Sequence, residues 1–412
     1  MSEATLSYVT EELVKSALVS DKGSQATLLS WSPESFTSKF DGHTSAISNI
    51  RVKYSLAGQG GEVSYVVKMN PKRGAQNDDF FGVIHTKECK FYSEIIPALN
   101  TVLKGIDQRP LSFPKCIYYN LEKGKEMIFL ENLREQGYKM QDKALGIDAA
   151  HAVLVLKELA RLHAASLLLQ ASCPHQDLAD RFDSLKKEWT REFNLGCDFG
   201  TFVEGYLNIG IDMFEKIGGC DRLVHWIKKI KPQVWQMYEM QLTKRPPFAV
   251  ITHGDCWINN LLFRYDDGDV PVDVKFLDLQ GCRKASLATD LQHFLNLNVT
   301  GPARRPNLNT FLASYHAAFT SIMQAGGSDT PFTLEELRQE YKDKGFYGVL
   351  YSIMWLPNMV RRPEDARDIL DSQEESKNSE RENVLRMVET NPLLKPRLLS
   401  VTDEWTEYGV IS

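Results

Sequence analysis

The stretch ITHGDCWINNLLFRYDDGDVPVDVKFLDLQ (251–280) holds acidic and amide side chains at short, regular spacings. Asp255 comes two positions after His253, Asn260 comes five positions after Asp255, and Asp278 closes an apolar run. Transfer of a phosphoryl group from ATP needs a carboxylate near the attacking hydroxyl and oxygen ligands for Mg²⁺. The spacing can provide both, with Asp255 as the base and with Asn260 and Asp278 as the metal ligands.

Two predicted elements would bring these side chains together. The apolar segment FAVIT (248–252) predicts a strand that ends just before the loop with Asp255. LLFRY, the turn DDGD and VDVKFLDL predict a hairpin, which would return Asp278 to the side of Asn260.

Each of these residues alone also fits an ordinary structural role. A lone histidine is commonly a hydrogen-bonded loop residue, a lone aspartate can cap a turn, and an asparagine can occupy a left-handed turn position. Taken jointly, with a strand before them and a hairpin between them, they favour the functional interpretation. A zinc site on His253 and Asp255 is disfavoured, because no third ligand has a suitable spacing.

The first ~130 residues predict a small α/β unit. Two alternating β-branched segments, SNIRVKYSL and EVSYVVKM, flank the turn AGQGG and predict a hairpin. A helical pattern follows from about residue 78 to about residue 103, with Pro97 expected to break or kink it. Two further strands are expected in PKCIYYNL and KEMIFLENL.

This unit is expected to hold the ATP phosphates. Lys68 ends the run YVVK, like the lysine of the V-A-I-K segment that contacts the α- and β-phosphates in kinases. Glu88, in the following predicted helix, is its expected partner, although Glu94 lies in the same helix.

A loop and a connector complete the expected nucleotide site. The segment DGHTS (41–45), with Gly42, Thr44 and Ser45, is expected to cover the phosphates through its backbone N–H groups, although it lacks the G-x-G-x-x-G pattern. The segment IFLENL is expected to be the connector, with the Glu131 carbonyl and the Leu133 N–H facing adenine.

Composition limits the partners and the location. The net charge is −6 and no block of Lys or Arg is present, so a nucleic-acid partner is not expected. No apolar window is long enough for a membrane span, and no signal peptide is visible. The seven cysteines form no C-x-x-C pair, as expected for reduced thiols in a cytoplasmic protein. The expected division is an ATP-binding lobe over 1–132 and a helical lobe over 133–412 that holds the catalytic loop and the substrate cleft.

The segments HGDCWINN, VKFLDLQ and ATDLQHFL resemble the ecdysteroid kinase-like (CHK kinase-like) family, within the aminoglycoside phosphotransferase and choline kinase group. The resemblance extends to FLENLREQGY and LKELARLHAAS and covers most of the chain. It implies an α+β, protein-kinase-like two-lobe fold, with a small mixed β-sheet lobe and a large, mainly helical lobe. It also implies ATP-dependent phosphorylation of a small-molecule alcohol, with an ecdysteroid or related sterol as a candidate acceptor and with ATP and Mg²⁺ as cofactors.

The resemblance carries the roles over residue by residue. Asp255 would be the base, with His253 orienting its loop and Asp290 bracing that loop from the start of a helix. Asn260 and Asp278 would bind Mg²⁺, and Lys68 would pair with Glu88. Asp278 begins D-L-Q where protein kinases have D-F-G, and the H-R-D arginine and A-P-E are absent, which disfavours a regulated protein kinase.

Two alternatives to this function stay open. One is a nucleotide-binding pseudokinase that acts through protein partners, and the other is a choline- or ethanolamine-type kinase. The aromatic segment GFYGVLYSIMWLPNM (345–359) is expected to be helix core, although it would also suit the binding of an apolar alcohol.

Overall fold

The structure is a computed structural model. It describes residues 9–34, 46–70, 78–122, 125–186, 188–194, 197–242, 246–362, 365 and 373–412.

The N-terminal part is a five-stranded sheet with one helix packed on it. The strands follow the order β1-β2-β3-β5-β4, and every pairing is antiparallel, so the sheet is not mixed. The elements of this part are α2 (Glu11–Lys22), β1 (Ala26–Glu34), β2 (Ala46–Leu56), β3 (Gln59–Met69), β4 (Cys116–Asn120) and β5 (Met127–Glu131). The sequence predicted the four strands β2 to β5 but not β1.

Alternation along β3 gives the sheet two different faces. Tyr65, Val67 and Met69 are buried under α2 in a small core of their own. Val66 and Lys68 point to the opposite face because neighbouring side chains on a strand alternate. Val66 packs against the larger core, so β3 carries Lys68 to the junction between the sheet and the rest of the molecule.

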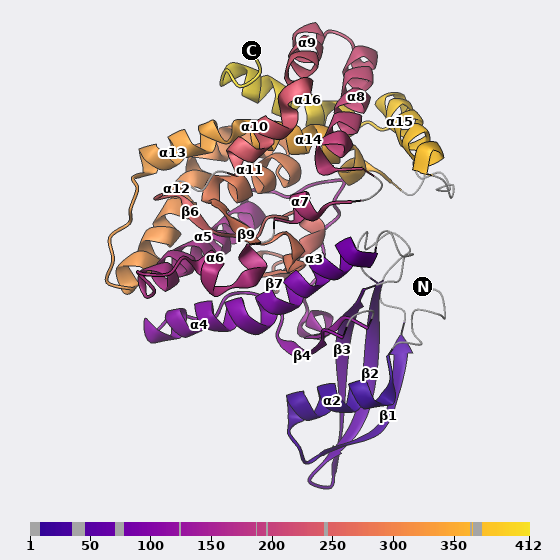
Figure 1. The fold of residues 1–412 in the computed structure, drawn as a ribbon, viewed down its shortest axis with the longest axis vertical. Coiled ribbons are helices and arrows are strands. Elements are labelled where there is room, and N and C mark those ends of the chain that lie inside the picture. The colour runs from indigo at the N-terminus through magenta and orange to yellow at the C-terminus, as the bar shows by residue number, and fades with distance from the viewer. Residues whose placement is uncertain are drawn as a thin grey trace.

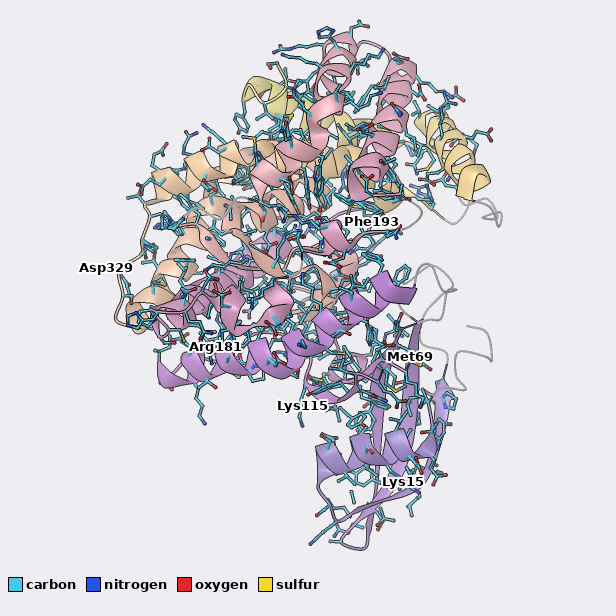
Figure 2. All side chains as sticks on the ribbon, in the orientation of Figure 1. Lys15, Met69, Lys115, Arg181, Phe193 and Asp329 are labelled. Atoms are coloured by element: carbon cyan, nitrogen blue, oxygen red, sulfur yellow. The ribbon has the colours of Figure 1, made fainter. Side chains whose placement is uncertain are left out.

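A long helical segment lies along this junction. α3 (Asp78–Lys90) continues through a π-helical turn, η1 (Phe91–Ile95), into α4 (Ile96–Gly105). The π turn ends two residues before Pro97, which cannot donate a backbone hydrogen bond. The predicted kink therefore takes the form of a local widening of the helix. Figure 2 shows Met69 on the sheet side of this helix and Phe193 on the other side.

The remainder of the chain is mainly helical (Figure 1). Its α-helices are α5 (Ala149–Ala171), α6 (Leu178–Arg181), α7 (Trp189–Glu192), α8 (Phe199–Ile217), α9 (Asp221–Ile230), α10 (Val234–Gln241), α11 (Leu287–Asn298), α12 (Gly301–Ala325), α13 (Leu334–Asp343), α14 (Gly345–Val360), α15 (Gln373–Thr390) and α16 (Leu394–Glu407). Its 3₁₀ turns are η2 (Leu133–Gln136), η3 (Asp183–Leu185), η4 (Lys231–Gln233), η5 (Ile258–Asn260) and η6 (Leu279–Gly281).

Two short strand pairs hold the loops of interest. β6 (Ala249–Thr252) pairs with β9 (Arg283–Ser286), and β7 (Leu261–Tyr265) pairs with β8 (Pro271–Phe276). The second pair is the predicted hairpin, which is confirmed.

The fold class is also confirmed as α+β, with a small sheet part and a large helical part. Helix α11 lies in the centre of the helical part, and all of its residues are buried. Among the helices in the described ranges, none is long and apolar enough to cross a bilayer.

Candidate active site

An ion-pair cluster forms where β3, α3 and the end of the hairpin meet. The Lys68 Nζ lies 2.6 Å from Oε2 of Glu88 and 2.8 Å from Oδ1 of Asp278. The Lys68 and Glu88 side chains are buried, and that of Asp278 is 21% exposed. Glu94, the alternative partner, is exposed on the same helical segment.

In this cluster, burial and the neighbouring charges shift the pKa values of the side chains in opposite directions. Burial raises the pKa of Glu88 to about 6, although the Lys68 ammonium pulls it downward. Burial alone would lower the pKa of Lys68, but the charges of Asp278 and Glu88 outweigh it and hold that pKa above its ordinary value. Lys68 is therefore a permanent cation that holds two carboxylates.

Asp278 adopts an unusual backbone conformation after β8. Its φ is +61°, in the left-handed region that few residues other than glycine occupy. The next residue, Leu279, directs its N–H at Oε1 of Glu88, 3.4 Å away, while Gln280 donates to Oδ2 of Asp278 at 3.3 Å. This turn aims the Asp278 carboxylate at Lys68.

The loop after β6 holds Asp255 and Asn260 together. The Asn260 amide nitrogen donates to the backbone carbonyl of Asp255 at 2.9 Å and to its Oδ2 at 3.0 Å. The backbone N–H of Leu277, next to Asp278, donates to the carbonyl of Asn260 at 2.8 Å. The hairpin thus brings its two ends together, as the sequence led us to expect.

The electrostatics of Asp255 suit a base. Burial, followed by the charge of Asp278, raises the pKa of Asp255 to about 7. A third of its side chain (32%) stays exposed. Its Oδ1 carries no hydrogen bond from the described residues and lies 4.0 Å from Nε2 of His293. A carboxylate that titrates near neutral pH can both accept and release a proton.

Asp290 fixes the start of this loop. Its carboxylate accepts the backbone N–H of His253 at 2.6 Å and that of Gly254 at 2.8 Å. Burial would raise the pKa of Asp290, but the hydrogen bond from His163 and the charges around it hold that pKa below its ordinary value. The His253 ring is buried and bonds to the Leu277 carbonyl at 3.0 Å, so it contacts the loop and not the open side of the site.

Two glycines allow the loop to pass close to the turn after Asp278. Gly254 has a φ of +77°, and a Cβ there would lie 2.0 Å from the carbonyl oxygen of Gly281. No side chain fits at this position.

The remaining predicted nucleotide contacts are less well defined. Glu131 ends β5 and Leu133 begins the 3₁₀ turn η2, so both lie in the segment that leads out of the sheet. Gly42, Thr44 and Ser45 lie outside the described residues.

Sequence reasoning missed several residues that position the site. The Asn298 side chain accepts the N–H of Ile258 at 2.7 Å and donates to the Cys256 carbonyl at 3.1 Å. His163 bridges Asp290 and Tyr315, at 3.1 and 2.7 Å. His163 stands in LKELARLHAAS, a segment that carries the family resemblance, but no role was assigned to it there, and Asn298 stands in none of the segments that carry the resemblance.

Residues 39–326 match the model of the ecdysteroid kinase-like family. The chain belongs to this family. An uncharacterized kinase-like protein of Caenorhabditis elegans is 23% identical over 280 residues, which are 66% of this chain and 65% of the length of that protein.

This ecdysteroid kinase-like chain is also similar to solved structures of small-molecule kinases. The ethanolamine kinase of Plasmodium vivax is 13% identical, with a TM-score of 0.39 over 85% of this chain and 81% of that one. The choline kinase LicA of Streptococcus pneumoniae is 12% identical, with a TM-score of 0.39 over 92% and 99%. The GDP complex of aminoglycoside 2'-phosphotransferase-IIIa is 13% identical, with a TM-score of 0.39 over 93% and 99%.

The donor set of this ecdysteroid kinase-like site fits Mg²⁺ better than a softer metal. The described residues contain no group of three or more His, Cys, Asp or Glu that could hold a metal ion by itself. Asn260 uses its amide nitrogen on Asp255, which leaves its amide oxygen for a ligand, and Asp278 adds a carboxylate. Mg²⁺ commonly binds through one or two such oxygens plus phosphates and water.

Proposed function

We propose that this protein transfers the γ-phosphoryl group of ATP to a hydroxyl group of a small molecule, with Asp255 as the general base. One observation carries the proposal. A buried lysine that is paired with a helix glutamate (Lys68 and Glu88) meets Asp278 at the same junction where Asp255 and Asn260 are joined. This set matches the parts that phosphoryl transfer requires.

Asp255 would take the proton of the attacking hydroxyl on Oδ1, because Asn260 already occupies Oδ2. The hydroxyl oxygen would then form the new bond to the γ-phosphorus as the bond to the β,γ-bridging oxygen breaks, and ADP would leave. Lys68 would hold the α- and β-phosphates, and Asp290 would keep the loop in place.

Asn260 and Asp278 would hold Mg²⁺, which neutralises charge on the phosphates when it is bound. In this structure Asp278 pairs with the Lys68 ammonium group, so Mg²⁺ would replace that group as its cationic partner.

The acceptor that we propose to test first is an ecdysteroid or related sterol, in keeping with the family. A stack of tyrosines beside His293, whose Nε2 lies 4.0 Å from Asp255, disfavours a choline-like cation. The rings of Tyr238, Tyr347 and Tyr351 stack on one another, and the Arg283 guanidinium lies 5.9 Å over the Tyr347 ring. An aromatic ring binds an ammonium ligand through its face, and here the Arg283 guanidinium already lies over the face of Tyr347.

Phosphate transfer from Mg·ATP to a panel of alcohols tests the proposal. The panel contains ecdysteroids, choline, ethanolamine and aminoglycosides. We expect one alcohol of the panel to be phosphorylated by wild-type protein, and at least about 10²-fold more slowly by Asp255→Asn. Nucleotide binding without transfer to any acceptor would instead support a pseudokinase, and the joint presence of Lys68, Asp255, Asn260 and Asp278 argues against that outcome.

A further inference from the structure

Lys87 occupies a buried position that the proposed reaction does not use. It lies two helical turns after Phe80 on α3, so the two side chains share one face of the helix. The Phe80 ring contacts the Phe193 ring at 5.4 Å, and Figure 2 shows Phe193 on the side of α3 away from the sheet. Lys87 therefore faces the helical part of the molecule, whereas Glu88 on the next face pairs with Lys68.

The Lys87 ammonium group has no partner in the part of the chain that the structure describes. Only 3% of the residue is exposed, and no hydrogen-bond acceptor lies within reach of its Nζ among the described residues. Burying a charged ammonium group without a partner is costly. Two further N–H groups on this side of the molecule are buried and equally without an acceptor in the described ranges, the Nε of Arg283 and the Nε1 of Trp189.

The charges around Lys87 do not balance. Glu188 and Arg283 are the charged side chains that act most on it, and burial lowers the pKa of Lys87. The Arg283 Nη1 already binds Oε1 of Glu188 at 2.8 Å, and its Nη2 donates to the Tyr347 hydroxyl at 2.6 Å. Arg283 already pairs with the Glu188 carboxylate, so the Lys87 ammonium group is left as an excess positive charge among the described residues.

We infer that Lys87 and Arg283 form a binding site for a small oxyanion, such as a carboxylate, sulfate or phosphate group. A single negative charge would match the excess cation, and its oxygens would accept the N–H groups that the protein leaves unpaired. Glu188 is 19% exposed and links this place to the surface. The anionic group could be free in solution or be part of the bound acceptor.

Thermal unfolding in sulfate tests this inference without any turnover. The melting temperature is measured while sulfate replaces chloride at constant ionic strength. We expect wild-type protein to gain about 2 °C at roughly tenfold the dissociation constant. Lys87→Met should lose this gain, and it should melt at or above the wild-type temperature in chloride, since it removes a buried unpaired charge. Lys87→Gln serves if the methionine variant does not fold.

Two controls locate the anion. Lys90→Met, on the same helix but half-buried, should keep the sulfate response. Lys68→Met should keep it too, because a response that depends on Lys68 would place sulfate at the nucleotide phosphates and overturn the inference. A sulfate response that Lys87→Met retains, or no response in wild-type protein, would also overturn it.

Inhibition of turnover by sulfate identifies the source of the anion. If sulfate competes with the best acceptor, the acceptor supplies the anion. If the inhibition is non-competitive with the acceptor, the anion is free in solution.

Discussion

The ammonium nitrogen of Lys68 lies 2.8 Å from Oδ1 of Asp278, although 210 positions separate the two residues in the chain. Lys68 comes from the sheet and Asp278 from the end of a hairpin in the helical part. This contact makes the two parts of the molecule meet at the proposed phosphate site, and under the proposal it would rearrange when a metal binds.

We predict that Asp278→Ala loses most of the rise in melting temperature that Mg·ATP gives to wild-type protein. A ligand that binds only the folded state stabilises it by RT ln(1 + [L]/Kd), so a loss of affinity lowers the rise in melting temperature. Asp267→Ala, at an exposed position in the turn of the same hairpin, should keep the full rise. An undiminished rise in Asp278→Ala would show that this carboxylate does not hold the metal.

Lys68→Met should raise the KM for ATP and lower kcat, while Lys53→Met at an exposed position on β2 should change neither. Burial already raises the pKa of Glu88 to about 6, and loss of the ammonium group would raise that pKa further. The folded variant would then hold a proton that the unfolded chain releases, so its stability should fall as the pH rises from about 4.5 through the raised pKa. Kinetics near wild type would refute the phosphate role.

Gly254→Ala should disrupt the catalytic loop. An alanine there combines a φ of +77° with a Cβ 2.0 Å from the Gly281 carbonyl oxygen. Backbone must move, so we expect a loss of activity of at least tenfold together with a lower melting temperature. Gly60→Ala, where a Cβ meets nothing within 4 Å, is the matched control. Normal turnover in Gly254→Ala would mean that the loop tolerates a different path.

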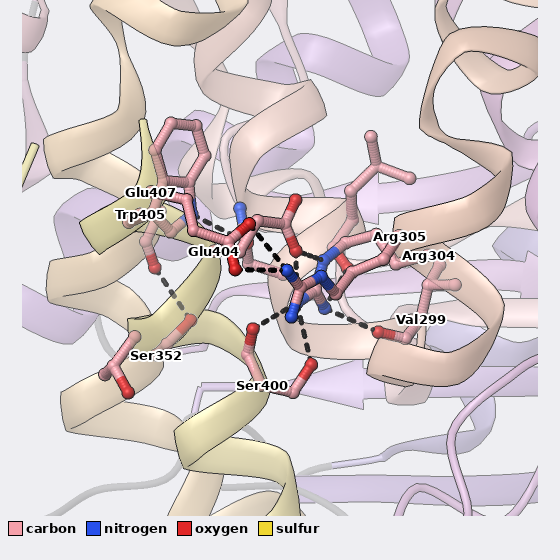
Figure 3. A network of polar contacts seen from close by, with 12 residues as sticks. Val299, Arg304, Arg305, Ser352, Ser400, Glu404, Trp405 and Glu407 are labelled. Carbon is pink, nitrogen blue, oxygen red and sulfur yellow. Dashed lines mark hydrogen bonds and ion pairs between the residues drawn. The ribbon is translucent and has the colours of Figure 1, made fainter. Parts of the chain in front are cut away.

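Neighbouring arginines on α12 contact the C-terminal helix in different environments (Figure 3). Arg304 is buried and binds Glu404 through Nη2 at 2.9 Å, with its Nη1 on the Val299 carbonyl. Arg305 binds Glu407 at 2.5 Å, but both side chains are exposed. Arg304→Met leaves a buried carboxylate unpaired and should cost about 3–5 kcal/mol of unfolding free energy. Arg305→Met should cost less than about 1 kcal/mol, and equal costs in denaturant titrations would contradict this account.

Local sequence patterns predicted much of the fold. In strands the alternation of apolar and polar residues, and in helices their spacing, indicates which side chains are buried. Strand β1 escaped prediction because it is an edge strand with only one fully buried residue, Ala26, and no clear alternation. The hairpin and the approach of Asn260 to Asp278 were predictable because a short turn fixes which residues face each other.

The contacts that sequence reasoning could not supply are those between distant segments. The sequence favoured Glu88 as the partner of Lys68 but left Glu94 as an alternative, and the helix face that meets Lys68 decides between them. The roles of His163 and Asn298 depend on how α5 and α11 pack around the loop, and the unpaired Lys87 depends on what lies opposite α3. Tertiary packing determines these contacts, and no short sequence motif indicates how the distant segments pack.

The turnover rate of Asp255→Asn tests the central claim most directly, measured with the best acceptor from the panel and beside the Mg·ATP affinity from calorimetry. The account predicts intact nucleotide binding and a fall in kcat of about 10²–10⁴-fold. Because the pKa of Asp255 is raised to about 7 and the base acts when ionised, wild-type kcat should rise with pH up to about 7 and then level off. This rise should be absent from the residual activity of the variant. Intact ATP binding with turnover near that of wild type would contradict the role of Asp255 as the base.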